Sequence, residues 1–409
     1  MKLLIIDVNN EHSSDMERNY INALTTATEV YYYGPGYSTE DEFKMGLKAY
    51  ISLLNGIDAI ILTQQFFLAS GRWGVRCAFS VNRHLLSNYS IFQALRYGER
   101  ILNELEGVDI LKIFLFFEDI ATLPDRWKDE LEVFVNKYFI ITPGSAFVEK
   151  IDEGDFFGSP INNNYLDFTS RYVDRIISLT PIAISDNELF FSPLQERKYD
   201  WVVPGNINRG YPQRLHINHL LDQSEFSLYN DFHHNRDLQY RADADRINHC
   251  IYMDDDIKFV HKYIDSVYID AHIPREIISQ WREAYSLSIR SSRAAWADGG
   301  TTKTIVRKHV EIPARGAVLF SDNVFGFEKF GFKDGVNAIL ATEDDIIEKS
   351  RELFKNPRKM QEIAREGQKM VIEKHTFRKR AECTLEAIKR IQNNKFYGTY
   401  WENGEIIYI

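Results

Sequence analysis

Charged and small residues gather in one short stretch, residues 306–322, which reads VRKHVEIPARGAVLFSD. If the stretch begins as a helix, Lys308, Glu311 and Arg315 lie three and four residues apart and share one face. An ammonium group and a carboxylate suit a nucleotide, because the cation attracts phosphate oxygens and the carboxylate accepts hydrogen bonds from ribose. A surface ion pair, worth about 0.5 kcal/mol or less, explains the same residues without a function.

The preceding stretch, SIRSSRAAWADGGTTKT at residues 288–304, favours the nucleotide. It predicts a strand over 286–290 that ends in Arg290 and two serines. Asp298-Gly299-Gly300-Thr301-Thr302 then precedes a predicted helix over 303–315. Backbone N–H groups at a helix start, hydroxyls and nearby cations together bind anions. A phosphate or diphosphate is therefore the expected ligand.

The elements that must position these residues alternate between short strands and amphipathic helices. In the first half, strand-like runs occupy residues 2–8, 29–33, 58–63, 111–117, 138–142 and 174–179. These runs are apolar without alternation, as in a parallel sheet that is covered on both faces. Helical spacing of apolar residues marks the stretches 41–55 and 91–106. The alternation is typical of a doubly wound α/β sheet.

The second half repeats this pattern after residues 180–199, which mix proline, serine and charge as an interdomain connection does. Further strands are expected near 201–204, 266–270 and 317–320, and helices over 212–222 and from 344 onward. The predicted fold is α/β, with two Rossmann-like doubly wound domains facing across a cleft. The expected divisions are residues 1–190, residues 191–380, and a C-terminal helix and tail over 381–409 that packs back towards the first domain.

Length and composition fit a soluble globular protein with more than one domain. The chain has 409 residues, of which 44% are hydrophobic and 26% charged, and its net charge is -10. A chain this acidic is not expected to bind nucleic acid broadly. Its cysteines, Cys77, Cys250 and Cys383, lie far apart and form no CxxC pair, which indicates a reducing compartment.

The first residues, MKLLIIDVNN, have a charged start and an apolar run, but the run is short and is interrupted by Asp7. They predict a first strand and not a signal peptide. No segment is long and apolar enough to span a bilayer. A cytoplasmic protein is expected, and peripheral contact with the inner face of the membrane is compatible with this expectation.

Several motifs follow one another in an order that resembles a known enzyme family. They are YYYGPGYS at 31–38, DAIIL at 58–62, GNINRGYPQR at 205–214, Glu311-Ile-Pro-Ala314-Arg-Gly316, Glu328, Asp334-Gly335-Val-Asn337, Glu366-Gly367, His375-Thr376 and Arg380. The order is similar to that of GT-B glycosyltransferases, above all the bacterial family 1/family 4-like enzymes grouped with the spore-maturation (CgeB-type) proteins. The resemblance touches both halves, is densest over 286–381, and implies the GT-B fold.

The resemblance also implies a nucleotide-sugar donor site in the second domain. Glu311 would bind the donor ribose, while Arg290 and Lys308 would face the diphosphate. The glycine-containing loop that opens the second domain would approach the phosphates, and a glycine after the Glu311 helix would let the backbone turn close to the ligand. The positions expected to bind the donor are Gly205, Arg209, Arg290, Lys308, Glu311 and Gly316.

A transferase that deprotonates an acceptor hydroxyl benefits from a base, and the ends of the first-domain strands supply candidates. The loop VNNEHSSD after the first strand offers Glu11 and His12, and FFED after the fourth offers Glu118 and Asp119. We expect Asp119 or His12 to be the catalytic base. Each has a structural alternative, since an aspartate caps turns and a polar side chain in a loop is often only solvated.

No metal and no cofactor are expected. The run Asp254-Asp255-Asp256 resembles a site for a hard cation and phosphate oxygens. The surrounding YMDDDIKFVHKY instead favours the start of a helix, whose first turn is stabilised by acidic residues. Histidines without a closed metal-ligand spacing are His216, His219, His233, His234 and His249.

The expected function is a metal-independent glycosyltransferase that moves a sugar from a nucleotide-diphosphate-sugar donor to a glycan, glycolipid or other cell-envelope acceptor. Two alternatives stay open: a sugar-nucleotide epimerase or hydrolase of the same fold, and a non-catalytic GT-B-like scaffold that binds glycans. Lys303 keeps the scaffold open, because many retaining relatives carry a glutamate eight positions before the ribose-binding one. The same departure leaves the stereochemistry of transfer undecided, and the oligomeric state is undecided too.

Overall fold

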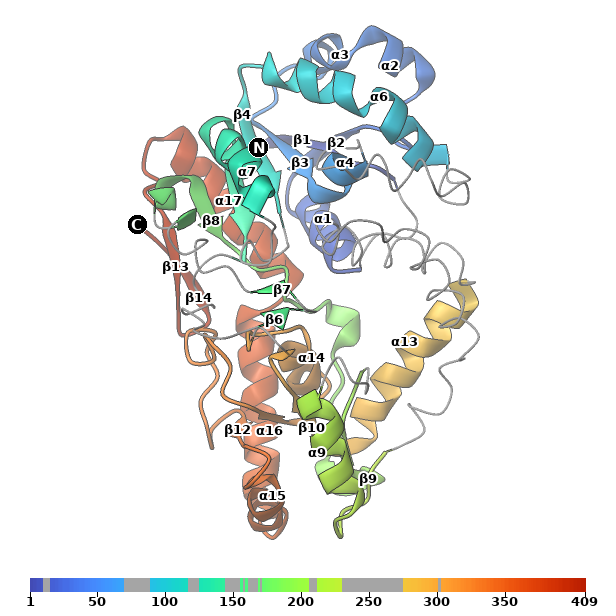
Figure 1. Ribbon diagram of the computed structural model, residues 1–409, viewed down its shortest axis with the longest axis vertical. Helices are drawn as coiled ribbons and strands as arrows, with labels where there is room; N and C mark the ends of the chain where they lie inside the picture. The colour runs from blue at the N-terminus through green and yellow to red at the C-terminus, as the bar shows by residue number, and fades with distance from the viewer. Residues whose placement is uncertain are drawn as a thin grey trace.

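The computed structural model describes residues 1–9, 15–69, 89–116, 125–143, 155–156, 159–160, 168–169, 171–205, 212–229, 275–300 and 303–409. In the part of the chain so described, the strands of two parallel sheets lie in separate lobes (Figure 1). Two antiparallel pairs complete the strands: β6 (Asp155–Phe156) with β7 (Ser159–Pro160), and a hairpin at the C-terminal end. The predicted fold class, two doubly wound α/β units, is confirmed by these sheets.

The first sheet has six parallel strands in the order β2-β1-β3-β4-β5-β8. Its strands are β1 (Lys2–Ile6), β2 (Glu29–Tyr33), β3 (Ala59–Thr63), β4 (Leu111–Leu115), β5 (Phe139–Thr142) and β8 (Ile176–Ser178). All six were predicted from unalternated apolar runs, because successive residues of one strand enter two different cores. Leu4 packs in one core, while Leu3 and Ile5 pack in the other.

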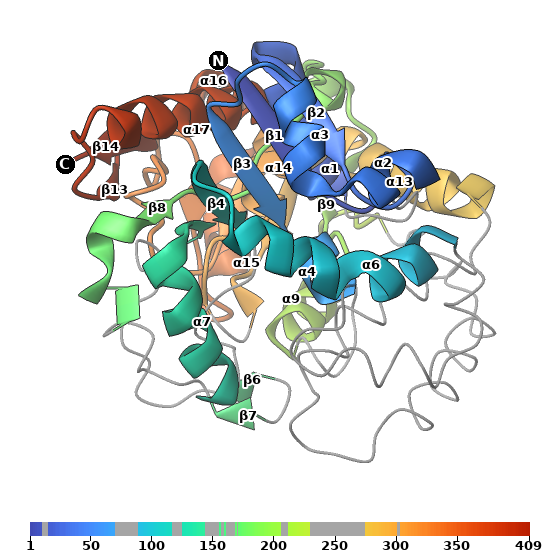
Figure 2. The same ribbon diagram turned by 90° about the horizontal axis from the view of Figure 1, so that it is seen from above.

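Helices cover both faces of this sheet. Figure 2 shows α6 and α17 on opposite sides of β1 and β3, in agreement with the two cores. The predicted helix over 41–55 is broken at Gly46, whose φ of 87° ends α2 before α3 begins. The helices of this lobe are α1 (Asp15–Ala27), α2 (Glu40–Met45), α3 (Leu47–Leu53), α4 (Gln64–Ala69), α6 (Tyr89–Glu106), α7 (Asp125–Lys137) and α17 (Phe377–Gln392).

The second sheet has four parallel strands in the order β12-β11-β10-β9. They are β9 (Tyr199–Val202), β10 (Ser292–Ala297), β11 (Val318–Ser321) and β12 (Ile339–Leu340). Helix α14 packs in the core on one face, whereas α9 and α15 pack on the other. The helices are α9 (Pro212–Asp222), α13 (Arg275–Arg290), α14 (Lys308–Ala314), α15 (Ile346–Phe354) and α16 (Pro357–Lys374).

The predicted strand over 286–290 is wrong. These residues form the last turn of α13, and the strand β10 begins at Ser292. Serines drive the change, because the Ser288 hydroxyl donates to the Tyr285 carbonyl and the Ser292 hydroxyl donates to the Ser288 carbonyl, as serines near a helix end do. The helix predicted over 303–315 is also shorter and begins only at Lys308. The strand expected near 266–270 lies outside the described residues.

Two described segments of the chain cross between the lobes, and both crossings pass the same point. Ile184 donates its N–H to His375 and accepts a hydrogen bond from Phe377, so the connection between the sheets lies beside the end of α16. The Arg380 guanidinium, fully buried, donates to the carbonyls of Thr180 and Ile182. His375, Thr376 and Arg380 thus pack at the joint between the two lobes.

The C-terminal residues return to the first lobe. Helix α17 packs on α1 and contributes Ala381 and Ile388 to the core that contains Leu3 (Figure 1). The hairpin of β13 (Thr399–Glu402) and β14 (Glu405–Tyr408) follows, and its Trp401 donates to the carbonyl of Ser178 on β8. The domain divisions near residues 190 and 380 stay predictions.

Candidate functional site

A lysine lies against a glycine backbone at the carboxyl edge of the second sheet. Gly205 follows β9 with a φ of 97°, a conformation that favours glycine. A methyl group on Gly205 would lie 2.6 Å from Nζ and 2.8 Å from Cε of Lys308. Lys308 is the first residue of α14. The structure therefore brings the start of α14 against the loop after β9, and with it two predicted donor-binding positions, Gly205 and Lys308.

A buried ion pair lies next to this contact. Arg214 on α9 donates from Nε to Asp298 Oδ2 at 2.8 Å and from Nη2 to Oδ1 at 2.9 Å. The Gly300 N–H donates to the same carboxylate at 3.0 Å. Burial alone would raise the pKa of Asp298, but the bonds from Arg214 and the charge of Lys308 hold it below its ordinary value. Asp298 is therefore ionised, and Arg214 is fixed in place.

A second carboxylate, Asp322, follows β11 at the same edge. Its Oδ1 accepts the N–H of Gly299 at 3.1 Å, and its side chain is almost fully buried. Burial raises the pKa of Asp322 to about 6, and the neighbouring charge of Asp298 adds to the rise. Gly299 permits this arrangement, since a methyl group there would lie 2.6 Å from the carbonyl carbon of Lys303.

His309, the second residue of α14, is a structural residue of the site. It is fully buried, and burial lowers its pKa to about 4, so the ring is neutral. The Ser321 hydroxyl donates to the Asp322 carbonyl, so the oxygen of Ser321 accepts from His309 Nε2 at 3.0 Å. His309 Nδ1 then accepts the Val306 N–H at 3.1 Å. The ring fixes the start of α14 to the end of β11.

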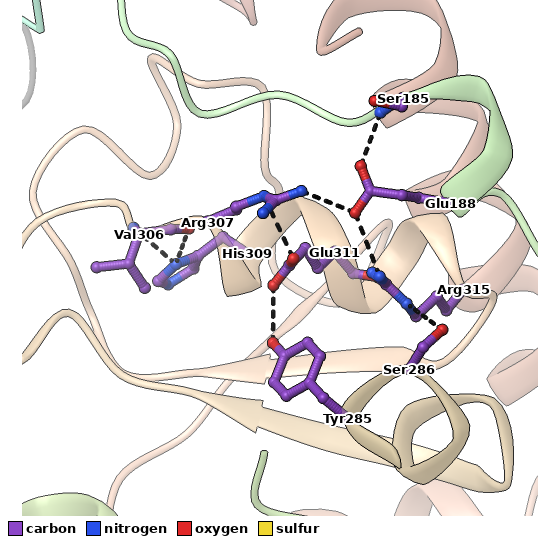
Figure 3. A network of polar contacts seen from close by, with 9 residues as sticks. All are labelled: Ser185, Glu188, Tyr285, Ser286, Val306, Arg307, His309, Glu311 and Arg315. Carbon is purple, nitrogen blue, oxygen red and sulfur yellow. Dashed lines mark hydrogen bonds and ion pairs between the residues drawn. The ribbon is translucent and has the colours of Figure 1, made fainter. Parts of the chain in front are cut away.

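Glu311 is the centre of a buried polar network and not half of a surface ion pair (Figure 3). Its Oε2 accepts from the Tyr285 hydroxyl at 2.7 Å, and its Oε1 lies 3.3 Å from Arg307 Nε. Burial and the charge of Glu311 raise the pKa of Tyr285 well above its ordinary value, so Tyr285 stays a donor. The alternative explanation of these residues, a surface ion pair, is therefore wrong, because Glu311 is buried and its cationic partner is Arg307.

A second carboxylate in the network ties α14 to the connection between the sheets (Figure 3). Glu188 accepts from Arg307 at 2.8 Å and from Arg315 at 3.2 Å. It belongs to a 3-10 turn (Asp186–Glu188), and the Ser185 N–H donates to it at 2.8 Å. The helix that carries Lys308 and Glu311 is thus held at both its start and its end.

Two predicted donor-binding residues lie at the opposite edge of this sheet. Arg290 ends α13 just before β10, pairs with Glu283 and lies over the ring of Phe190. Gly316 precedes β11 and has a φ of 70°, as a glycine after a helix does. A methyl group on Gly316 would lie 2.9 Å from the Arg197 guanidinium, so its role here is to admit Arg197. The structure does not bring Arg290 or Gly316 to Gly205 and Lys308.

The other predicted site residues lie outside the described part of the chain. They are the donor-loop residue Arg209 and the candidate bases His12 and Asp119 with Glu11 and Glu118. The acidic run Asp254 to Asp256, expected to start a helix, lies outside it too. Lys303, where the resemblance to retaining glycosyltransferases led us to expect a glutamate, is exposed at a φ of 50°, and its charge opposes the rise in the pKa of Asp322.

The described residues also bear on metal binding and on membrane insertion. They contain no group of three or more His, Cys, Asp or Glu side chains that could hold a metal ion. No helix among them has both the length and the apolar character needed to cross a bilayer.

Sequence reasoning missed three residues of this edge. Arg214 and Asp322 stand in the stretches 205–214 and 306–322, but only a structure shows that Arg214 pairs with Asp298 and that Asp322 accepts from Gly299. Tyr285 stands 26 positions before Glu311 and carries no motif. The one available signal was Asp298 directly after a strand and before two glycines, a position at which side chains face the ligand edge of an α/β sheet.

Comparison with known proteins supports the resemblance over part of the chain. Residues 261–386 match the family model described as glycosyl transferase-like. No curated protein matches the chain.

Solved structures of similar shape are remote in sequence. Anabaena HepE in complex with UDP is 11% identical, with 95% of this chain and 100% of that chain covered and a TM-score of 0.49. A glycosyltransferase from Rickettsia africae ESF-5 is 10% identical, with 96% and 99% covered and a TM-score of 0.48. Sucrose-phosphate synthase from Thermosynechococcus elongatus is 9% identical, with 96% and 100% covered and a TM-score of 0.45.

All three TM-scores are below 0.5, so the fold assignment rests on the strand order of the two sheets. The family match contains β10, α14 and β11, which carry Asp298, Lys308 and Glu311. The resemblance to glycosyltransferases predicted from the sequence is thereby confirmed for residues 261–386, the segment that builds most of the site.

Proposed function

We propose that the chain is a glycosyltransferase that takes a sugar from a nucleotide-diphosphate-sugar donor and passes it to a glycan or other cell-envelope acceptor. One observation carries the proposal: Lys308 is held against the backbone of Gly205, beside the Arg214–Asp298 pair, within a segment that matches glycosyl transferase-like proteins. The carboxyl edge of a parallel α/β sheet is where such folds bind nucleotides.

The arrangement suits a diphosphate leaving group. In the reaction, the bond between the anomeric carbon and the diphosphate oxygen breaks, and negative charge grows on that oxygen. Arg214 is a cation fixed by its ion pair with Asp298, and Lys308 lies beside it at Gly205. Charges that are in place before the reaction starts stabilise developing charge most effectively. Close approach of the phosphates is easiest at Gly205, which has no side chain. This chemistry needs no metal ion.

Nucleotide binding tests the donor site. A thermal-shift panel of UDP, GDP, CDP, ADP and TDP, each with magnesium and with EDTA, should show one family that stabilises the protein equally in both. At a hundredfold excess over its dissociation constant, a ligand stabilises the folded state by about 2.7 kcal/mol. Lys308→Met should abolish the shift, while Lys355→Met, which changes an exposed lysine after α15, should leave it unchanged.

Two further results would contradict the proposal. If no nucleotide stabilises the protein, the site is not a donor site and the non-catalytic scaffold becomes the better interpretation. If a nucleotide sugar is bound and converted without any acceptor, the protein is an epimerase or a hydrolase of the same fold. We also propose that Glu311 binds the donor ribose, so Glu311→Gln, which keeps the size of the side chain, should weaken nucleotide binding.

A further inference from the structure

The strand order of the first sheet places a reversal at β1. The chain runs from β1 outward to β2, returns to the other side of β1 with β3, and continues outward through β4, β5 and β8. Doubly wound sheets bind ligands in the crevice at the carboxyl ends of the two strands where the order reverses. In this sheet the two strands are β1, which ends at Ile6, and β3, which ends at Thr63.

A buried carboxyl group bridges this reversal point. Asp7 follows β1 directly and is only 5% exposed. The hydroxyl of Thr63, the last residue of β3, donates to Asp7 Oδ1 at 2.5 Å. The bond from Thr63 would be enough for an aspartate with a purely structural role. The second carboxyl oxygen, Oδ2, lies 3.5 Å from the Tyr37 hydroxyl, which is long for a hydrogen bond.

An aromatic side chain, Tyr37, lies beside the carboxyl group. Gly34, after β2, lies so close to Asp7 that a methyl group there would be 2.0 Å from the Asp7 carbonyl oxygen. This contact seats the loop that carries Tyr37 over Asp7. The Tyr37 ring stacks on Tyr32 with centroids 4.6 Å apart and is 37% exposed. A flat ring beside a carboxylate is a surface that recognises a sugar, because the ring contacts its C–H face and the carboxylate accepts from its hydroxyls.

We propose that Asp7 binds the acceptor hydroxyl and takes up its proton, while the Tyr37 ring supports the acceptor sugar. This inference rests on the proposed glycosyl transfer. In the step, the acceptor O–H bond breaks and the proton goes to Asp7. The oxygen forms a bond to the anomeric carbon, and the diphosphate leaves with the electron pair of the broken C–O bond. Atoms and charge balance without a further reactant.

The charges around Asp7 suit this role. Burial raises the pKa of Asp7 to about 6, while bonds from Thr63, Val8 and Tyr37 and the charge of Arg18 on α1 limit the rise. Tyr32, from β2, also faces the group and is uncharged at neutral pH, since its own pKa is raised by burial. Asp7 is thus ionised at pH 7 and more basic than an ordinary aspartate, as a general base should be.

The test compares Asp7→Asn with Asp41→Asn, which changes a 91% exposed aspartate on α2. Asp7→Asn should keep the nucleotide-induced thermal shift and lose about 100-fold or more in transfer, the usual contribution of a general base. Wild-type transfer should rise with pH through about 6. Thr63→Val removes a bond that lowers the Asp7 pKa, so it should move this limb to higher pH.

Tyr37 supplies a second readout that does not depend on the fold of the Asp7 variant. Tyr37→Ala should raise the acceptor KM and leave the donor KM unchanged, while Tyr37→Phe keeps the ring and should change KM little. The inference is overturned if Asp7→Asn transfers sugar as fast as the wild type. It is also overturned if the pH dependence of transfer is the same in Thr63→Val as in the wild type, even when nucleotide binding is confirmed. Failure of nucleotide binding in the wild type instead overturns the proposed function, so the two failures are distinguishable.

Discussion

Two carboxylates at the carboxyl edge of the second sheet differ in their affinity for protons because their neighbours differ. Asp298 faces the Arg214 guanidinium with both oxygens, and its pKa is lowered. Asp322 has the backbone of Gly299 and the negative charge of Asp298 beside it, and its pKa is raised to about 6. One group is always charged, and the other changes its charge in the pH range where the site would operate.

The Asp322 charge should cost stability at neutral pH. Its folded pKa of about 6 exceeds the ordinary 3.8, so the folded state prefers the protonated acid. The stabilising contribution is complete below about pH 3.8 and is lost as the pH rises through about 6. Two pKa units correspond to roughly 3 kcal/mol. Asp322→Asn should therefore be more stable than the wild type at pH 8 by up to this amount.

The measurement is urea unfolding of both proteins at pH 4 and pH 8. The difference in free energy of unfolding between Asp322→Asn and the wild type should be small at pH 4 and large at pH 8. Asp345→Asn is a useful control, because the pKa of Asp345 is lowered by Lys349 and its substitution should not stabilise at pH 8. A difference that does not grow with pH would show that Asp322 is not strained in the folded state.

At the scale of single elements, the site depends on the loop between β9 and α9 and on the start of α14. Gly205→Ala should displace the Lys308 ammonium, since the new methyl group would lie 2.6 Å from it. Gly56→Ala is a matched control, because Gly56 has a φ of 94°, close to the 97° of Gly205, with no atom within 4 Å of the added group.

Both variants should have a free energy of unfolding lower than the wild type by a similar amount, about 1–2 kcal/mol, because alanine is strained at a positive φ. Only Gly205→Ala should also lose nucleotide binding, by about tenfold or more if Lys308 faces the phosphates. Isothermal titration with the nucleotide found in the thermal-shift panel measures this difference. Equal binding by both variants would show that Lys308 is not a phosphate ligand.

The sequence predicts an element well when burial dictates its pattern. The six strands of the first sheet are recognisable because branched apolar residues enter two cores, as Leu3 and Leu4 do. Strand β10 is not recognisable, because SRAAWA consists largely of alanine, which is small enough to sit beneath packed helices but has a low strand propensity. The preceding SLSIR is apolar enough to suggest a strand, and only its serine bonds show that it ends a helix.

The same reasoning explains which site residues were predictable. Lys308 and Glu311 stand close together in the sequence, on one short helix, so their spacing was visible. The partners of Glu311 come from α13 and from the turn before α14, and those of Asp298 from α9. Arg290 was expected at the carboxyl edge of the sheet because it was assigned to the end of a strand. It ends helix α13 instead and therefore lies at the opposite edge. A wrong secondary-structure assignment thus leads to a wrong prediction of the site.

At the scale of the whole molecule, one arginine joins the two crossings between the lobes. Arg380 donates to the carbonyls of Thr180, Ile182 and Lys374 and to Nδ1 of His375. Burial lowers the pKa of Arg380 to about 10, which still leaves it charged at neutral pH. The lobes are therefore linked by a polar centre, and two of its acceptors belong to the fully buried residues Thr180 and His375.

Arg380→Met should lower the free energy of unfolding by about 3 kcal/mol or more, because several buried acceptors lose their donor. Arg378→Met, an exposed change two residues earlier on α17, should cost less than about 0.5 kcal/mol. Urea unfolding followed by far-ultraviolet circular dichroism measures both. Equal midpoints for the two variants would mean that water replaces the guanidinium.

The return of α17 to the first lobe also affects how the protein is made. Leu3 and Ile5 leave the ribosome early, but the helix that covers them starts only at Phe377. Helix α1 contributes Tyr20 and Leu24 to the same core, but the part of this sheet face that α17 covers stays exposed while the second lobe is synthesised. The first lobe cannot complete its folding in chain order, and its yield should depend on chaperones that shield an apolar sheet until the last helix arrives.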